Sequence, residues 1–331
     1  MQKIKLAILS GGDSAERGIS ELSAGTVFEH TDRSKYDARL IDLDGMHWSD
    51  LETGTPVDKN NFSIIIDGAQ WRPEVIFCAI HGSPMENGLL QGYFDVLEIP
   101  YTCCDGFVSA LTMNKYLTKQ VLRPAGIPLA HEFFLRVDTP ITDDLIDHIA
   151  ADIKLPMFIK PNKNGSSFGV TKVKAHEQIR LAIQEAFRYD TEILCETYLP
   201  GREFGNGVFE SNGEMVVLPV TEIIPKTEFF TYEAKYEGLS EEITPAEISD
   251  TLREKVQEYT GRIYRLLDIK GFARVDYILV EDEFYLLEVN TVPGLSPASI
   301  IPQQAIAQGY TLTSFFDLII SEAIRENKPS I

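Results

Sequence analysis

Two strand-like segments near the carboxyl end constrain this chain more than any other feature. Residues 273–280 and 284–294 are rich in aromatic and β-branched side chains, and the acidic residues 281–283 lie between them. Such a pair of segments with a short connection predicts a β-hairpin. With a three-residue turn, Val280 would pair with Phe284.

In that register Asp276 lies opposite Glu288, and Arg274 lies opposite Asn290. Side chains alternate between the two faces of a strand, so all four of these polar side chains share one face. The other face is apolar and carries Val275, Tyr277, Leu287 and Val289. The hairpin is therefore predicted to have one face for chemistry and one face for the core.

The opposed carboxylates of Asp276 and Glu288 need a partner. Cross-strand neighbours lie roughly 5 Å apart, and at an effective dielectric constant near 20 their repulsion is about 3 kcal/mol. A divalent cation held by both carboxylates and by the amide oxygen of Asn290 would remove this repulsion, and an all-oxygen set suits magnesium. The alternative is a solvated acidic face. Arg274 and the exit sequence 290–294 favour the metal site.

Composition excludes some partners. The formal net charge is −20 and the isoelectric point is near 4.7, so the chain lacks the basic surface that nucleic acids or anionic membranes require. No apolar run is long enough for a signal-peptide core or a membrane span. The cysteines show no zinc-ligand spacing and fit a reduced, cytoplasmic protein: Cys78, Cys103, Cys104 and Cys195.

The amino-terminal third alternates between strand and helix patterns. Strands are predicted at residues 3–9, 38–43, 62–66 and 75–80, and helices at 20–30 and 88–97. This alternation predicts a parallel sheet with helices on its faces, in a first α/β domain that ends near residue 103.

The rest of the chain predicts two further units. The first begins with one helix over 105–122, followed by strands at 132–137, 156–160, 170–174 and 192–196 and helices at 143–151 and 176–188. The second contains strands at 204–210 and 215–220, a long functional loop over 225–243, a helix over 245–267 and the hairpin. The overall class is therefore α/β in the first unit and α+β in the others.

A loop rich in glycine and serine follows Lys160. Residues 160–170 offer backbone amides and a lysine, which a phosphate cradle needs. The ending of a Walker loop is missing, and a loop of this composition between strands is often only a turn.

Glu16 and His81 follow two of the predicted parallel strands. The loop at 11–16 fails as a dinucleotide fingerprint because Asp13 and Glu16 occupy two of its glycine positions. The carboxyl ends of parallel strands form the ligand edge of such a sheet, so Glu16 is a candidate ligand contact. For His81 a structural and a functional role remain equally open.

Taken in order, the motifs resemble the D-alanine–D-alanine ligase family of the ATP-grasp superfamily, over nearly the whole chain. They are Gly11-Gly12 with residues 14–17, His81-Gly82, Gln91-Gly92, 99–102, 113–115 with Thr118-Lys119, Lys160-Pro161 with 165–167, 232–236, 271–276 and 288–294.

The resemblance implies an ATP-grasp enzyme that joins two D-alanines through an acyl phosphate for peptidoglycan synthesis. It implies ATP and two magnesium ions, with manganese as an alternative, and a cytoplasmic homodimer. The expected divisions are a Rossmann-like domain over 1–103, a central ATP-grasp subdomain over 104–195, and a carboxyl-terminal subdomain with the metal site over 196–331.

The resemblance also assigns roles to the nucleotide and metal residues. Asp276, Glu288 and Asn290 match the metal ligands of the family. Lys115 and Lys160 match contacts to the phosphates of ATP, and Lys235 matches a contact to the transferred phosphoryl group. Four further residues match those that hold adenine and ribose: Glu196, Tyr198, Leu199 and Glu203.

For the substrates, Glu16 matches the residue that receives the ammonium of the first D-alanine. Ser299 and the amide of Ile300 match the groups that hold the carboxylate of the second, and His81 matches a substrate contact. The remaining expected active-site residues are Arg274 and the amide of Gly294, which stabilise the oxyanion, and Ser166 and Tyr236, which form a hydrogen-bond network with Glu16.

The sequence departs from the family pattern at Met85, Asn87 and Asn164, and two of these departures remove a carboxylate near the substrates. The alternatives are therefore a ligase for D-lactate or D-serine, or an ATP-binding protein without ligase activity. Residues 225–243 contain no histidine, which disfavours D-lactate, and the intact metal set disfavours a non-catalytic protein.

Overall fold

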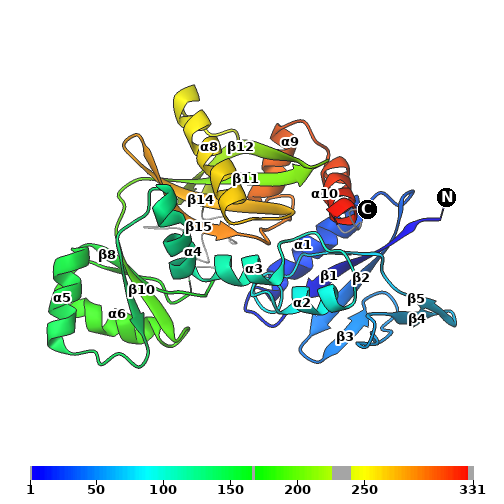
Figure 1. Cartoon of the computed structure of the whole chain (residues 1–331), viewed down its shortest axis with the longest axis horizontal. Coiled ribbons are helices and arrows are strands. Elements are labelled where there is room, and N and C mark those ends of the chain that lie inside the picture. The colour runs from blue at the N-terminus through cyan, green and yellow to red at the C-terminus, as the bar shows by residue number, and fades with distance from the viewer. Residues whose placement is uncertain (1, 166–167, 226–239, 327–331) are drawn as a thin grey trace.

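The computed structural model describes residues 2–165, 168–225 and 240–326. Within them the strands form a four-stranded mixed sheet near the amino terminus, a four-stranded antiparallel sheet in the middle and a five-stranded antiparallel sheet near the carboxyl end, with a small two-stranded sheet beside the first (Figure 1). The predicted mixture of α/β and α+β units is confirmed. No helix in these ranges is long and apolar enough to span a membrane.

The first unit is an α/β layer. Its elements are β1 (Ile4–Gly11), α1 (Arg17–His30), β2 (Tyr36–Asp44), β3 (His47–Asp50), β4 (Ile64–Ile66), β5 (Ala69–Trp71), β6 (Val75–Phe77) and α2 (Leu89–Val96). The sheet order is β3-β2-β1-β6, with β1 parallel to both neighbours and β3 antiparallel to β2.

One predicted strand of this unit lies elsewhere. The segment 62–66 was expected in the parallel sheet, but β4 pairs only with β5 in a separate hairpin. Asp67 and Gly68 both have positive φ, 51° and 77°, which is the conformation of a two-residue hairpin turn. The chain therefore reverses before it can join the parallel sheet.

The middle segment contains α3 (Gly106–Met113), α4 (Lys115–Leu122), the 3-10 turn η1 (Arg123–Ala125), β7 (Glu132–Arg136), α5 (Asp143–Ile153), β8 (Met157–Pro161), β9 (Thr171–Val173), η2 (His176–Gln178), α6 (Ile179–Ala186) and β10 (Glu192–Thr197). The predicted single helix over 105–122 is wrong, because Asn114 ends α3 and begins α4 with extended backbone angles. Its side chain accepts a hydrogen bond from the Leu117 amide at 2.9 Å, so it caps the second helix.

The last segment contains β11 (Arg202–Ser211), β12 (Glu214–Pro225), β13 (Ser240–Ile243), α8 (Asp250–Leu266), β14 (Phe272–Val280), β15 (Glu283–Asn290), α9 (Ile300–Ala307) and α10 (Leu312–Glu326). Two expectations need correction here. The helix predicted from Pro245 begins at Asp250, because Ser249 caps it through the Leu252 amide. The predicted loop 225–243 ends in β13, while residues 226–239 lie outside the described residues.

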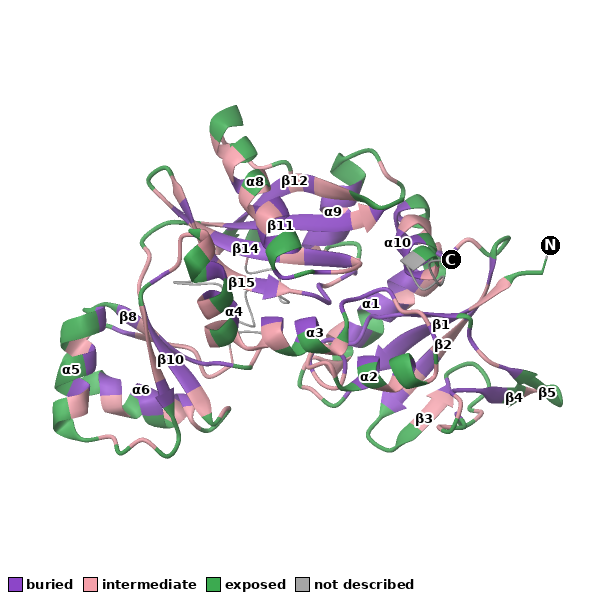
Figure 2. Cartoon of the chain, in the orientation of Figure 1, coloured by how far each residue is buried: buried purple, intermediate pink, exposed green. Residues whose placement is uncertain are grey.

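The buried hydrophobic residues of the described ranges fall into four core clusters. Figure 2 marks the buried positions on the ribbon. Helix α10 packs against both the first and the last sheet, since the ring centroids of Phe316 and Phe77 lie 5.7 Å apart and those of Phe315 and Phe209 lie 5.2 Å apart. Helices α3 and α4 join the core beneath the five-stranded sheet. The division at residues 103 and 195 stays a prediction.

Candidate active site

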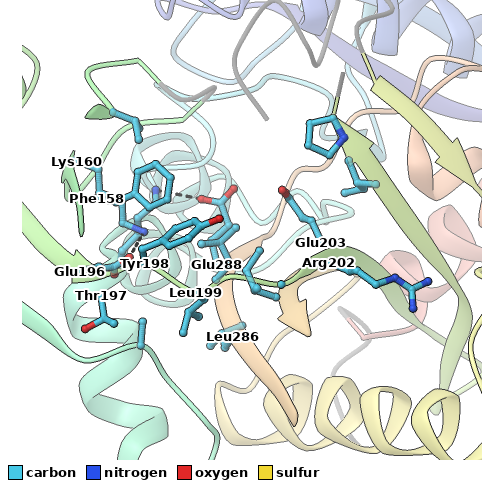
Figure 3. A pocket seen from close by; sticks show the side chains of 18 of the residues that line it. Phe158, Lys160, Glu196, Thr197, Tyr198, Leu199, Arg202, Glu203, Leu286 and Glu288 are labelled. Atoms are coloured by element: carbon cyan, nitrogen blue, oxygen red, sulfur yellow. Dashed lines mark ion pairs between the residues drawn. The ribbon is translucent and has the colours of Figure 1, made fainter. Parts of the chain in front are cut away.

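A cavity of about 360 Å³ is lined by residues of both the middle and the last sheet. Figure 3 shows its side chains around a common space, with the Lys160–Glu196 pair on one side and Glu203 on the other. Six of the seven residues that the resemblance assigns to ATP line this cavity: Lys115, Lys160, Glu196, Tyr198, Leu199 and Glu203. The seventh, Lys235, lies outside the described residues.

Two buried lysines fix the charge of Glu196 in this cavity. Lys160 Nζ lies 2.6 Å from one carboxylate oxygen, and Lys119 pairs with the other. Burial by itself would raise the pKa of Glu196, but the two ammonium groups outweigh burial and lower the pKa to about 2. Glu196 is therefore an ionised hydrogen-bond acceptor at neutral pH.

Lys119 belongs to one of the motifs that carry the family resemblance, but the sequence analysis assigned it no role. It is only 1% exposed and lines the cavity four residues after Lys115 on helix α4. Residues four apart lie on one face of a helix, so this spacing was a signal that the two lysines share a site.

The hairpin has the predicted partners on its polar face but a different turn. Val280 pairs with Glu283, so the connection has two residues and the predicted pairing of Val280 with Phe284 is wrong. A register shift between Asp276 and Tyr277 compensates for the missing residue. The predicted pairs Asp276–Glu288 and Arg274–Asn290 are confirmed.

The same shift corrects the predicted core. Leu287 was expected on the apolar face with Tyr277, but Leu286 pairs with Tyr277 and is buried, while Leu287 lines the cavity. A β-bulge adds one residue to one strand, and this moves the following side chain to the other face. Leu286 and Leu287 thereby join Phe158 in forming apolar walls suited to an aromatic base.

On the polar face of the hairpin, Arg274 binds Asp276 through two nitrogens at 2.7 and 2.8 Å, and the amide of Asn290 donates to Asp276 at 2.9 Å. Glu288 lies 3.3 Å from Lys115 Nζ. Two carboxylates and an amide oxygen are the hard donors that magnesium prefers, so these residues fit the predicted metal. The amide of Asn290 presents its oxygen after a half-turn about its terminal bond.

In the described part of the chain, the hairpin included, no group of three or more histidine, cysteine, aspartate or glutamate side chains could hold a metal ion. The predicted magnesium site has two carboxylates and one amide, so a search for three such side chains does not test it. All four cysteines are buried and free.

Glu16 lies in a second cavity of about 360 Å³, which Ser14, Asn87, Lys163 and Asn164 also line. A β-carbon placed on Gly165 would lie 3.0 Å from a carboxylate oxygen of Glu16, so the glycine-rich loop lies directly against this residue. Both asparagine departures from the family pattern thus share one cavity with Glu16.

Glu86 is a second residue that received no role from the sequence. It lines a small cavity with Lys115, Glu288 and Asn290, and it accepts a hydrogen bond from the Gly82 amide at 2.6 Å. Burial raises the pKa of Glu86 to about 8, and repulsion by nearby carboxylates adds to this effect.

His81 is buried at the end of the first sheet, and its Nε2 lies 3.0 Å from the hydroxyl of Ser23. Burial lowers the pKa of His81 to about 4, although a hydrogen bond to the Val292 backbone opposes this, and the charge of Arg274 adds to it. The imidazole is therefore neutral at physiological pH. The Ser23 hydroxyl also accepts from the Leu295 amide at 3.1 Å, which ties His81 to the loop after the hairpin.

Ser299 begins helix α9 in that loop. Its hydroxyl lies 2.8 Å from that of Ser296, and a β-carbon on Gly294 would lie 2.9 Å from Ser299 Oγ. Ile300, the next residue, and Arg274 both lie against Gly205. The structure thus brings Arg274, Gly294 and the first turn of α9 together, whereas Ser166 and Tyr236 lie outside the described residues.

Known protein families match this chain along most of its length. Residues 5–104 match the model for the D-ala D-ala ligase N-terminus, and residues 121–321 match that for the D-ala D-ala ligase C-terminus. The chain belongs to the D-alanine–D-alanine ligase family. It is 43% identical to the D-alanine–D-alanine ligase of Flavobacterium johnsoniae over 94% of this chain and 96% of that protein. The chain is accordingly an ATP-dependent ligase.

Solved structures share the whole fold. D-alanyl-alanine synthetase A from Vibrio cholerae superposes with a TM-score of 0.88 at 27% identity, covering 98% of this chain and 99% of that one. The VanG D-Ala:D-Ser ligase from Enterococcus faecalis gives 0.85 at 30% identity, with coverage of 97% and 100%. The ATP complex of the Bacillus anthracis D-alanine–D-alanine ligase gives 0.79 at 26%, with 98% of each chain. The predicted ATP-grasp fold is confirmed.

Proposed function

We propose that this ligase joins two D-alanines to D-alanyl-D-alanine through an acyl phosphate, as a step in peptidoglycan precursor synthesis. The observation that carries the proposal is the continuity of the site. The cavity with the six nucleotide residues reaches Glu288, which lies opposite Asp276 and beside Lys115. The nucleotide residues and the metal residues therefore meet at Glu288 and Asp276. Arg274, which binds Asp276, and helix α9 border the proposed substrate site.

ATP occupies the cavity between the two sheets in this proposal. Lys115 and Lys160 contact its phosphates, Lys235 reaches the transferred group, and the ionised Glu196 accepts a hydrogen bond from the base. Asp276, Glu288 and Asn290 hold magnesium, or manganese in its place. When bound, the two expected ions neutralise phosphate charge during transfer.

The two substrates lie beyond the phosphates. Glu16 binds the ammonium of the first D-alanine, and the first turn of α9 binds the carboxylate of the second through Ser299 and Ile300. Arg274 and the Gly294 amide stabilise the oxyanion formed when the amine attacks. The neutral His81 acts as a hydrogen-bonding contact, and Ser166 and Tyr236 connect to Glu16.

A second candidate is ligation of D-serine as the second substrate. It is favoured by the likeness to a solved ligase of that specificity, and the two departures Asn87 and Asn164 line the neighbouring cavity around Glu16. VanG, at 30% identity, is a D-Ala:D-Ser ligase. D-lactate remains disfavoured because residues 225–243 contain no histidine.

A homodimer in the cytoplasm completes the proposal. Leu89 and Val96 lie seven residues apart on α2, and both are exposed, as is Phe107 at the start of α3. Gly88 and Gly106 touch, so these apolar side chains belong to one surface. Sedimentation of the intact protein tests this surface: a dimer that Val96→Asp converts to monomer supports it, and a monomeric wild type contradicts it.

The Glu288→Gln variant tests the ATP chemistry. Loss of a ligand charge removes several kcal/mol of charge stabilisation at the phosphates, so ADP release and dipeptide formation should fall by about 100-fold or more. Thermal stability should stay near that of the wild type, because glutamine has the same shape and can still bond to Lys115. The measurement is coupled ADP release with D-alanine at several magnesium concentrations.

Glu283→Gln is the matched control, since Glu283 lies on the same strand but pairs with Lys255 at 2.8 Å. It should keep wild-type turnover. Wild-type turnover in Glu288→Gln would contradict the proposed metal site.

A further inference from the structure

Gln304 is a buried polar side chain to which neither the motifs nor the family resemblance assigns a role. It lies on α9, five residues after Ser299, and it is 0% exposed. Its amide makes three hydrogen bonds to the five-stranded sheet. The oxygen accepts from the Gly207 amide at 2.8 Å, and the nitrogen donates to the Gly205 carbonyl at 2.8 Å and to Thr221 Oγ1 at 2.9 Å.

These bonds lie at an irregularity in β11. The register with β12 shifts between Asn206 and Val208, so Gly207 has no partner residue on that strand. A buried backbone amide without a partner is costly. Gln304 supplies the missing acceptor, and its donor bonds to Gly205 and Thr221 fix the direction of its amide.

The irregular segment also borders the site. On its other edge Gly205 pairs with Asp276 and Gly207 with Arg274. A β-carbon on Gly205 would lie 3.3 Å from both Arg274 Cδ and Asp276 Oδ1 and 3.5 Å from Ile300 Cδ1. One on Gly207 would lie 2.6 Å from the oxygen of Gln304. The two glycines thus let α9 lie directly on β11, beside the Arg274–Asp276 pair.

Ile300 and Gln304 are four residues apart and therefore lie on the same face of α9. Apolar contacts hold the helix against the sheet but allow it to slide, whereas three directional hydrogen bonds fix its position along β11. That position sets the distance from the amide of Ile300 and the hydroxyl of Ser299 to Arg274.

We infer that Gln304 is a positioning residue that sets the binding site for the carboxylate of the second substrate. The inference rests on the proposed function, because it takes the first turn of α9 as the acceptor site. Gln304 acts through α9 and touches neither substrate nor nucleotide. A shift of the helix weakens the hold on the acceptor and leaves the sites of ATP and of the first D-alanine in place.

The test is the Gln304→Met variant, which keeps the length of the side chain and removes all three hydrogen bonds. Its Michaelis constant for the second D-alanine should rise about tenfold, the effect of one lost buried hydrogen-bond partner. The Michaelis constants for ATP and for the first D-alanine should change less than about twofold. Steady-state ADP release over a wide range of D-alanine concentrations gives the two constants for D-alanine, and the same assay at varied ATP gives the third.

A matched control separates positioning from a general loss of stability. Gln257 on α8 donates to the Leu218 carbonyl at 3.0 Å, so it supports the same irregularity while α8 packs on the opposite face of the sheet. Gln257→Met should lower the melting temperature without raising the acceptor constant. If Gln304→Met does not fold, Gln304→Asn keeps a polar group one methylene shorter and should give the same selective rise.

An unchanged acceptor constant in a folded Gln304 variant overturns the inference, as does an equal rise in all three constants. Failure of the wild-type protein to form a dipeptide would instead overturn the proposed function, so the two failures are distinguishable.

Discussion

Burial acts on three residues of the site in three different ways. Glu196 stays ionised because two lysines outweigh its desolvation. The pKa of Glu86 rises to about 8 because it is buried, with other carboxylates nearby. His81 loses its charge because burial disfavours the imidazolium form. Residue type alone therefore does not give the charge at this site, and the neighbours must be known.

The first prediction concerns the pH dependence of stability through His81. Its pKa falls from an ordinary 6.5 to about 4 on folding. Between these values the unfolded chain binds a proton that the folded chain does not, so stability falls as the pH drops from 6.5 toward 4. The contribution of His81 to this loss down to pH 5 should be about 2 kcal/mol, while the raised pKa of Glu86 acts in the opposite direction. His81→Gln should remove the His81 contribution, so stability at pH 5 relative to pH 7 should rise by about 2 kcal/mol against the wild type, measured by urea unfolding at both pH values.

His176→Gln is the control for that experiment, since His176 is exposed and pairs with Asp147 on the surface. It should keep the wild-type difference between pH 7 and pH 5. An imidazole signal of His81 that titrates near pH 6.5 in NMR would contradict the assignment.

The prediction that Asp276 faces Glu288 is right because two differences cancel: the turn is one residue shorter than expected, and the bulge restores the register. The position of Leu287 was not predictable. The bulge beside Tyr277 contains no glycine or other local sequence signal. It accompanies a turn of two residues, whereas a turn of three residues was expected. Lys119 was within reach of sequence reasoning through its helical spacing from Lys115.

At the scale of elements, the break between α3 and α4 shows a tertiary contact overriding a local pattern. The apolar spacing over 105–122 continues through Asn114, so a single helix was the natural prediction. Asn114 accepts a hydrogen bond from the side chain of Asn162 at 2.9 Å, and the Asn162 side chain accepts from the Tyr116 amide at 2.8 Å. A partner 48 residues away cannot be read from the pattern.

The second prediction concerns this cap. Asn114→Ala should lower the free energy of unfolding by about 1–2 kcal/mol. It should also raise the Michaelis constant for ATP severalfold, because Lys115 is the first residue of α4 and its backbone amide bonds to the Asn162 carbonyl. Urea unfolding and initial rates at varied ATP give the two values.

Thr142→Ala provides the comparison, since Thr142 caps α5 through the Leu145 amide and does not line the nucleotide cavity. A similar loss of stability is expected with no change in the constant for ATP. If both variants raise that constant equally, the cap does not position Lys115.

At the scale of the whole molecule, three sheets surround one site, and their arrangement was only partly visible in the sequence. The order of strands and helices predicted three units. The return of α10 to the first sheet was not predicted, because it depends on contacts such as Phe316 with Phe77 that join opposite ends of the chain. The same holds for α9, whose place on β11 depends on two glycines and Gln304.

The specificity of the complete site is the central claim of this account, and a competition between acceptors tests it most directly. The protein is given ATP, magnesium and equal concentrations of D-alanine, D-serine and D-lactate at several pH values from 6 to 8, and the products are identified by mass spectrometry. D-alanyl-D-alanine should predominate at every pH, with one ADP released per dipeptide, because residues 225–243 contain no histidine that would favour a hydroxy acid as acceptor. A predominant D-alanyl-D-serine or depsipeptide product would contradict the account and would indicate that Asn87 or Asn164 has changed the substrate.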